Sequence, residues 1–491
     1  MALRQCSKRL WLEIHRPELR ADSSGAETRF QVGYEAGEVA RQLYDPSGQG
    51  ALIDIDADGF NQAFVRSASL LQTSQPIFEA AFSAGGALAF ADVMFPEPGT
   101  TPLRWRMVEV KSSTRVKDYH RDDVAVQSYV ALAAGIPVSS IAVACIDSSW
   151  VYPGGGNYVG LLQEHDLTAE AKSRQEEVQT WIAQAQEIAA QDQEPPISIG
   201  THCDEPFECG FYTYCSRNES QPEYPVFWLP HISGKLIREL AEEGVNDMRN
   251  VPNALLNERQ LRVKHHTLAG TVYFDATGAA QDLSEFPLPV QFLDFETIQF
   301  AVPIWAGTRP YQQIPFQYSL HTLTESGELQ HYEFLGLDGG DPSLKLALAL
   351  IAGCGTHPWP IFAYNAGFEK SRIRELAERF PEHAAALHAI NARIVDLLPI
   401  ARTRYYNPNQ HGSWSIKAVL PAAVPDLRYS DLEGVQDGGM AMEAFLEALH
   451  PETTPELKQT LQQQLLAYCK LDTYAMVRLW QVFAGRTDLD L

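Results

Sequence analysis

The sequence predicts an α/β protein with two domains joined by a small helical connector. Its 491 residues exceed one typical domain of ~100–200 residues. Hydrophobic residues make up 45% and charged residues 20%, as in folded chains with substantial cores. Aromatic and aliphatic runs of strand character alternate with segments of helical spacing. Polar, proline-punctuated breaks at 217–225 and 282–289 divide the chain into 1–220, 221–285 and 286–491.

The first domain is expected to be a mixed unit in the order helix, strands, helix, strand. The expected helices cover 29–44 and 120–134, and the expected strands cover 76–82, 87–95, 105–111 and 139–146. In the connector, helical spacing from Leu236 to Leu240 is broken at Gly244 and again at Pro252. This pattern predicts a helix-turn-helix element that either spaces the domains or holds a nucleic-acid backbone.

The second domain is expected to begin with a strand at 290–297. A second strand at 361–365 leads into a helix, and residues 465–480 form a long helix near the C-terminus. The class is therefore α/β in both domains.

Composition indicates the cellular compartment of the protein and excludes some classes of partner. The chain has 38 Lys plus Arg and 62 Asp plus Glu, a net charge of −24, which argues against coating nucleic acid or anionic membrane electrostatically. No run of ~20 apolar residues and no signal peptide is visible, so a cytoplasmic location is expected. Seven cysteines are too few for a disulfide scaffold, and clustered cysteines in a reducing compartment indicate metal.

A first candidate site lies on two neighbouring predicted strands. Glu109 and Lys111 are two apart, so their side chains share a face, and the preceding strand offers Asp92. Two carboxylates on paired strands can hold Mg²⁺ through oxygen, and a nearby lysine can orient water. The alternative is a surface ion pair on an amphipathic strand. The apolar neighbours Met107 and Val108 indicate a partly buried strand instead.

Basic residues surround this first site. Segment 101–121 carries six basic and two acidic side chains, a local charge of +4. Such a strip can attract phosphate. The candidate nucleic-acid-binding residues here are Arg104, Arg106, Arg115 and Lys117.

Asp92, the Glu109–Lys111 triplet and Gln127 resemble, in order and spacing, the PD-(D/E)xK nuclease superfamily. The similar branch contains bacterial recombination helicase-nucleases and CRISPR adaptation exonucleases (RecB-like). This resemblance implies a restriction-endonuclease-like fold for 1–220 and catalytic roles for these four side chains, with Asp92 and Glu109 also binding Mg²⁺ or Mn²⁺. The branch places a further ligand on the first helix, a role that falls to Glu38.

Three cysteines, Cys203, Cys209 and Cys215, are separated by five residues each, and Cys6 stands alone near the N-terminus. The spacing is wider than the usual C-x₂₋₄-C zinc pairs. Four thiolates can hold a [4Fe–4S] cluster. The same nuclease branch shares one early and three late cysteines, and the resemblance implies a structural [4Fe–4S] cluster on these four residues, with Zn²⁺ as the alternative. The other three cysteines, Cys145, Cys354 and Cys469, are expected in the core.

A second candidate site combines three segments. Asp294 and Glu296 share a strand face, Glu369 follows a strand, and Tyr468 and Asp472 are four apart on the last helix. Converging carboxylates can hold two metal ions ~4 Å apart for in-line phosphoryl displacement. A tyrosine beside the last aspartate can orient water.

These segments resemble the DEDD superfamily of 3′–5′ exonucleases, and the Tyr468–Asp472 spacing is that of its tyrosine subgroup (DEDDy). The resemblance implies an RNase H-like fold for 286–491, with Asp294, Glu296 and Asp472 as catalytic metal ligands. Glu369 stands where that family has Asp, and its extra methylene can shift a ligand by ~1 Å. Asp396 is a reserve acid, and Lys417 is a candidate phosphate contact or helix cap.

The whole arrangement resembles an uncharacterised bacterial family that joins these two modules in one chain, and the resemblance implies a nuclease. It would hydrolyse DNA at ends or in single strands with Mg²⁺ or Mn²⁺, in repair, recombination or defence. The alternatives are an RNA-processing nuclease and a nucleic-acid-binding scaffold with one or both sites inactive. No membrane association is expected, and protein partners are not predicted.

Overall fold

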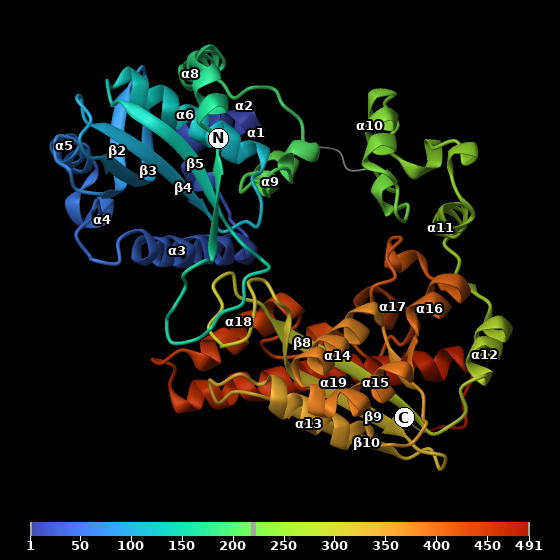
Figure 1. The fold of residues 1–491 in the computed structure, drawn as a ribbon. Coiled ribbons are helices and arrows are strands. Elements are labelled where there is room, and N and C mark those ends of the chain that lie inside the picture. Colours follow the sequence, from blue (N-terminus) through green and yellow to red (C-terminus); the bar gives the residue numbers. More distant parts are fainter. Residues whose placement is uncertain (1, 218–221, 490–491) are drawn as a thin grey trace. The chain divides into compact units, whose positions relative to one another are not determined.

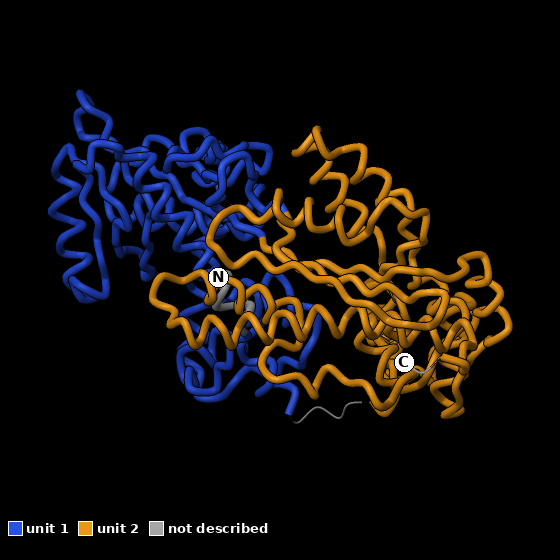
Figure 2. Tube along the Cα trace, turned by 90° about the horizontal axis from the view of Figure 1, so that it is seen from below, with its two compact units in different colours: residues 1–219, 299–312 blue, residues 220–298, 313–491 orange. Residues whose placement is uncertain are grey.

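The computed structural model describes residues 2–217 and 222–489 (Figure 1). The chain forms two compact units, coloured separately in Figure 2. The first unit contains residues 1–219 together with 299–312, and the second contains residues 220–298 and 313–491.

The first unit is built on a six-stranded mixed sheet with the strands in chain order. β1 pairs with β2 and β4 pairs with β5 in parallel, and the other neighbours are antiparallel. The strands are β1 (Ala51–Leu52), β2 (Ile77–Ala84), β3 (Ala87–Glu97), β4 (Arg104–Lys111), β5 (Val138–Ile146) and β6 (Leu162–Asp166).

Helices cover this sheet. α6 (Asp118–Ala133) contacts β2, β3 and β5, α5 (Phe60–Leu70) contacts β2, and α3 (Ser24–Tyr44) contacts β4. α8 (Gln175–Ala189) packs on α6 and on α2 (Ser7–His15). The shorter helices are α1 (Ala2–Gln5), α4 (Ile55–Asp58), α7 (Thr168–Ser173) and α9 (Tyr212–Ser216). The inward side chains of the strands and of α6 form one buried apolar core.

The second unit contains a five-stranded mixed sheet in the order β10-β9-β8-β11-β12. β8, β9 and β10 are antiparallel neighbours, whereas β11 runs parallel to β8 and to β12. Every residue of β9 is buried, so both faces of the sheet are covered. The strands are β8 (Val290–Ile298), β9 (Ile314–Leu323), β10 (Leu329–Leu335), β11 (Ile361–Ala363) and β12 (Ile394–Asp396).

The longest helix of the second unit, α19 (Pro455–Phe483), packs on β8, β9 and β10. It begins with a side-chain cap, in which Thr454 accepts a hydrogen bond from the Leu457 N–H, and Pro455 occupies the first turn. The other helices are α13 (Ser343–Cys354), α14 (Gly367–Arg379), α15 (Ala384–Ala392), α16 (Leu398–Arg404), α17 (Ile416–Ala423) and α18 (Gly438–Leu449).

The predicted connector is helical. It holds α10 (Gly234–Glu242), α11 (Glu258–Ala269) and α12 (Ala276–Ser284). It groups with the second unit, since β7 (Tyr273–Phe274) pairs with β13 (Tyr405–Tyr406). The sequence breaks therefore mark changes of element rather than the edge of a third compact unit.

Residues 299–312 lie between β8 and β9 in the chain but belong to the first unit, not to the second domain in which the sequence placed them. Tyr311 donates a hydrogen bond to the backbone oxygen of Ser112, and the Tyr158 hydroxyl donates to the Pro303 oxygen at 3.3 Å. This segment also packs against apolar and aromatic side chains that lie far upstream in the chain.

The predicted helices and strands of both domains are confirmed, with ends that differ by at most five residues except on the last helix, which is longer. The mixed α/β class is also confirmed. Within residues 2–217 and 222–489, no helix has the length and apolar character needed to cross a membrane.

Candidate active sites

The structure brings together four of the residues predicted for the first site. β3 carries Asp92, β4 carries Glu109 and Lys111, and α6 carries Gln127. The Lys111 Nζ lies 2.5 Å from Glu109 Oε1, and Gln127 Nε2 donates to Glu109 Oε2 at 2.8 Å. Asp92 Oδ2 accepts a hydrogen bond from the Val110 backbone N–H at 2.6 Å.

Burial dominates the electrostatics of this site. It raises the pKa of Glu109 to about 8, with Asp92 adding to the shift and Lys111 opposing it. Burial also raises the pKa of Asp92 to about 7, and the charge of Lys111 opposes this shift. Both acids therefore bind protons unusually strongly when no cation is present. The Gln127 Oε1 is buried and has no hydrogen-bond partner among the described residues, although its Nε2 is satisfied.

Two further acids join the first site, and the sequence analysis missed both. The Lys111 Nζ also lies 2.8 Å from Asp123 Oδ2. Asp123 is four residues before Gln127 on α6, so helical spacing could have revealed it. Glu79 lies in β2 between Phe78, which pairs with Val93, and Ala80, which pairs with Ala91, and its φ is 58°. No sequence signal announces this positive φ.

Glu79 is a stronger candidate than Glu38 for the additional ligand of this site. Burial raises the Glu79 pKa to about 6, and the charge of Glu109 adds to the shift. Glu38 instead forms an ion pair with Arg41, and its side chain is 46% exposed. Glu79 therefore lies near enough to Glu109 for the two charges to interact, while the predicted helix residue pairs with an arginine.

We expect Glu79→Gln to weaken Mn²⁺ binding at the first site by about 10–100-fold, the range seen when a supporting group of a metal site is lost. Glu38→Gln is the matched control, since it makes the same chemical change and is expected to leave Mn²⁺ affinity within twofold. Calorimetric titration of both variants checks this. If Glu38→Gln weakened Mn²⁺ binding more than Glu79→Gln, Glu38 would be the better candidate for the additional ligand.

The basic strip keeps some free charge. Arg104, Arg115 and Lys117 are exposed, while Arg106 is ion-paired with Glu164. Lys117 lies 5.5 Å from the centre of the Tyr119 ring. Three of the four side chains of this strip that are predicted to contact phosphate are therefore accessible. Arg106 must break its ion pair with Glu164 before it can bind phosphate.

The four predicted cluster cysteines converge in the first unit. Burial raises the pKa of Cys215 to about 11, and Cys209, Cys203 and Cys6 all add to this shift through their charges. The Cys203 pKa is likewise raised by burial and by Cys209 and Cys6. None of the four is in a disulfide.

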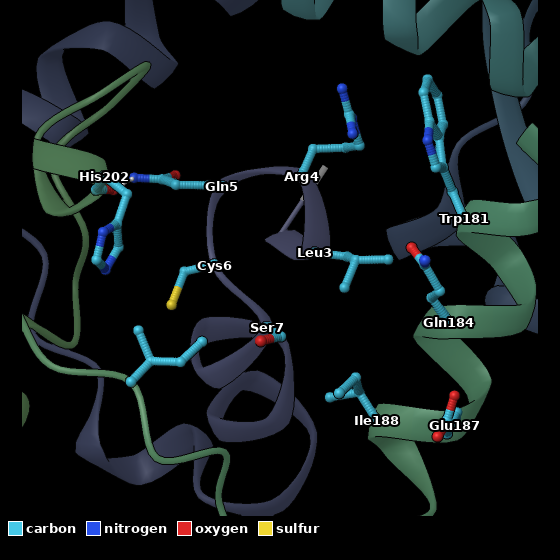
Figure 3. A pocket seen from close by; sticks show the side chains of 11 residues that line it. Leu3, Arg4, Gln5, Cys6, Ser7, Trp181, Gln184, Glu187, Ile188 and His202 are labelled. Atoms are coloured by element: carbon cyan, nitrogen blue, oxygen red, sulfur yellow. Dashed lines mark hydrogen bonds between the residues drawn. The ribbon is translucent and has the colours of Figure 1, made fainter. Parts of the chain in front are cut away.

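The N-terminal segment is hydrogen-bonded to the segment that carries Cys203, Cys209 and Cys215, here called the late cysteine segment. The Gln5 Nε2 donates to the backbone oxygens of His202 and Phe207, both at 2.7 Å. Beside this contact lies a cavity of about 530 Å³, lined by Cys6, His202 and Trp181 among others. Figure 3 shows the Cys6 sulfur between the His202 ring and Ser7.

The second site also assembles as predicted. β8 carries Asp294 and Glu296, α14 carries Glu369, and α19 carries Asp472. Burial raises the Asp294 pKa well above its usual value, and the charges of the other three acids raise it further. Burial is also the main cause that raises the pKa values of Glu296 to about 8, Glu369 to about 7 and Asp472 to about 6.

Two tyrosines and a lysine complete this site. The Tyr429 hydroxyl donates to Asp472 Oδ1 at 2.5 Å, and Tyr468 is also hydrogen-bonded to Asp472. Lys417 Nζ lies 5.1 Å from the Tyr468 ring centre and 5.3 Å from that of Tyr429, and donates to the Gln436 oxygen at 2.9 Å. The positive charge of Lys417 partly opposes the rise in the pKa values of Asp294, Glu296 and Asp472. Tyr429 was missed, because no regular spacing links it to Asp472.

Glu369 and the reserve acid Asp396 differ in their bonding. Glu369 is 3% exposed, and its Oε2 is buried without a hydrogen-bond partner among the described residues. Asp396 Oδ1 accepts hydrogen bonds from the backbone N–H groups of Asn365 at 2.9 Å and Leu398 at 3.0 Å. Asp396 thus stabilises the local backbone, while Glu369 keeps an oxygen available for a cation.

The ligand atoms of Asp294, Glu296 and Cys469 lie within 4.8 Å of one another. Cys469 is fully buried, as predicted, but it also borders the carboxylates. The arrangement can bind divalent cations through oxygen ligands.

Comparison with known proteins gives one match. Residues 291–415 match a family model described as "Domain of unknown function (DUF2779)". This segment includes Asp294, Glu296 and Glu369 but ends before Asp472. No curated protein and no solved structure matches the chain.

Proposed function

We propose that the protein is a divalent-metal-dependent nuclease with two separate carboxylate sites. The observation that carries this proposal is the convergence of Asp294, Glu296, Glu369 and Asp472 in a buried second site. The charges of three acids raise the pKa of Asp294, which is unfavourable without a cation, and the buried Glu369 oxygen without a partner among the described residues is a donor that a metal ion could use. Mg²⁺ or Mn²⁺ would neutralise these acids and activate water for attack on phosphorus.

The remaining side chains of the second site have roles suited to hydrolysis. Tyr468, hydrogen-bonded to Asp472, is positioned to orient a water molecule beside the acids. Lys417 supplies positive charge near the same point, where it can favour an approaching phosphate. Tyr429 donates to Asp472 Oδ1 and helps to fix the orientation of that carboxylate.

The first site repeats this chemistry with a lysine. The Lys111 ammonium group bonds to both Glu109 and Asp123, which places its positive charge next to the metal-binding acids. There it can orient water and stabilise charge that develops on the phosphate. Asp92 accepts a hydrogen bond from the Val110 N–H, which helps to fix the orientation of this carboxylate.

The folds are compatible with this proposal. A mixed sheet with the acids on β3 and β4 and the amide on α6 suits a PD-(D/E)xK nuclease. A five-stranded mixed sheet with acids on its central strand and on the last helix suits an RNase H-like DEDDy exonuclease.

The cysteines suit an iron–sulfur cluster with a structural role. The charges of Cys209, Cys203 and Cys6 all act on Cys215, so the four thiols lie near one another. Four thiolates can hold a [4Fe–4S] cluster, with Zn²⁺ as the alternative. The cluster would join the N-terminus to the end of the first unit, where Gln5 already bridges them.

DNA ends or single strands are the proposed substrate. The charge of −24 opposes binding along a duplex, while exposed Arg104, Arg115 and Lys117 give a short basic strip. Affinity should therefore be modest and should fall with added salt. RNA ends offer the same phosphates, so both nucleic acids belong in the test.

Two single variants test the proposal. We expect wild-type protein with Mg²⁺ or Mn²⁺ to degrade labelled DNA, Asp92→Ala and Asp294→Ala each to remove one part of the activity, and the double variant to remove all of it. The assay compares single- and double-stranded DNA and RNA and uses protein purified without oxygen. Unchanged degradation by the double variant would refute the proposal, and inert wild type that still binds DNA would favour a scaffold.

A further inference from the structure

The second site contains a sulfur atom that oxygen-based metal binding does not need. The Cys469 Sγ lies within 4.8 Å of carboxylate oxygens of both Asp294 and Glu296. It is 4.0 Å from the Asp294 backbone oxygen, to which the thiol donates. Cys469 lies between Tyr468 and Asp472 on α19, so the helix that supplies the last acid also delivers the sulfur.

We infer that Cys469 is a ligand for thiophilic divalent cations, such as Zn²⁺ or Cd²⁺, that bind together with Asp294 and Glu296. The second site would then hold two classes of metal ion in different ways. Mg²⁺ would use the carboxylates alone, and a softer ion would add the sulfur. The inhibitory consequence described below rests on the proposed nuclease function, whereas the metal site itself does not.

An independent observation supports a cation at this position. The Glu369 Oε2 is buried and lacks a partner within the described chain, and Glu369 acts electrostatically on Asp294. Two carboxylates and one sulfur supply three of the four ligands that Zn²⁺ prefers, and Glu369 is a further buried acid on the same site.

Ligand softness gives the two metal classes different consequences. Thiolate favours Zn²⁺ and Cd²⁺, whereas Mg²⁺ requires oxygen ligands in octahedral geometry. As the sulfur–metal bond forms, the Cys469 thiol releases its proton to solvent. The bound ion is then held by an additional strong ligand, so Zn²⁺ should occupy the site and block Mg²⁺-dependent turnover.

Cadmium is the probe, because sulfur-to-cadmium charge transfer absorbs in the ultraviolet. The full chain is titrated with Cd²⁺ under a phosphine reductant and without oxygen, as wild type, Cys469→Ser and Cys354→Ser. Cys354 is the matched control, since it is equally buried in the second unit and lies outside the site. The four clustered cysteines contribute equally to all three titrations.

We expect Cys469→Ser to lose the absorption of one cadmium–sulfur bond per chain and Cys354→Ser to match wild type. Asp294→Asn, which keeps the sulfur but removes a carboxylate, is expected to lose the same increment. Cys469→Ala serves if Cys469→Ser does not fold. Equal titrations of Cys469→Ser and Cys354→Ser would overturn the inference.

The functional arm measures the Zn²⁺ concentration that half-inhibits Mg²⁺-dependent cleavage. We expect this concentration to rise about tenfold or more in Cys469→Ser and to stay unchanged in Cys354→Ser. An inert wild type would refute the proposed function, while the cadmium titration would still decide the role of Cys469. Active enzyme with no cysteine-dependent increment would refute this inference alone.

Discussion

Asp294→Asn is expected to abolish cleavage at the second site while making the metal-free protein more stable. Metal ligation supplies several kcal/mol of transition-state stabilisation, so its loss should reduce the rate by about 10³-fold or more. The same carboxylate lies near Glu296, Glu369 and Asp472, and the charges of all three raise its pKa. Removing the Asp294 charge should therefore relieve this repulsion in the folded state when no cation is present.

The pH dependence follows from the direction of these shifts. The pKa of Glu296 rises from 4.5 to about 8 on folding. Between these values the unfolded chain is ionised while the folded chain keeps its proton, so the folded state binds more protons and the free energy of unfolding falls as pH rises. The slope is on the order of 1.4 kcal/mol per pH unit for each such group. In EDTA, wild type should lose stability from about pH 5 to pH 8.

Thermal melting in EDTA and in Mg²⁺ measures this effect. At pH 8 in EDTA we expect the Tm of Asp294→Asn to exceed that of wild type by about 3 °C or more. Mg²⁺ should raise the wild-type Tm and leave that of the variant nearly unchanged. Glu443→Gln, at an exposed position of α18, is the control and should behave as wild type. A lower Tm for Asp294→Asn in EDTA would contradict the electrostatic account.

Cys209→Ser is expected to remove the iron–sulfur cluster and to loosen the first unit. Cys209 lies in the buried group that contains Trp11, Leu12 and Phe211. A metal centre at this point would hold α2 against the late cysteine segment, and the free energy of metal binding would contribute directly to folding. We expect iron and sulfide to fall from about four per chain to near zero, and the Tm of the first unit to fall by about 5 °C or more.

Cys145→Ser is the matched control for this change. Cys145 is also buried in the first unit, but it lies on β5 with Ser113 as its neighbour. It should retain full iron and sulfide content. Zinc in place of iron, at one ion per chain and lost in Cys209→Ser, would favour the zinc alternative. No bound metal in wild type prepared without oxygen would contradict both.

Much of the fold was predictable because its signals are local. Runs of aromatic and aliphatic residues predicted β4 and β8, and the two-residue period of a strand placed Glu109 with Lys111 and Asp294 with Glu296 on common faces. The four-residue spacing of Tyr468 and Asp472 put both on one face of α19. Each of these relations depends only on the geometry of a single strand or helix.

The division of the chain was less predictable. Composition breaks marked the connector, yet its helices group with the second unit, and residues 299–312 group with the first. Contacts between segments far apart in the chain decide such grouping, as in the pairing of β7 with β13. No local pattern encodes those contacts.

The sequence by itself therefore determined the α/β class, the positions of the main strands and helices, and the acids that lead each candidate site. Only the tertiary structure decided which further residues complete them. It gave Glu79 a positive φ near Glu109, brought Tyr429 to Asp472 from 43 residues away, and set the Cys469 sulfur beside two carboxylates. The physical reason is that strand and helix periodicity arises within one element, whereas ligand distances arise from how different elements pack.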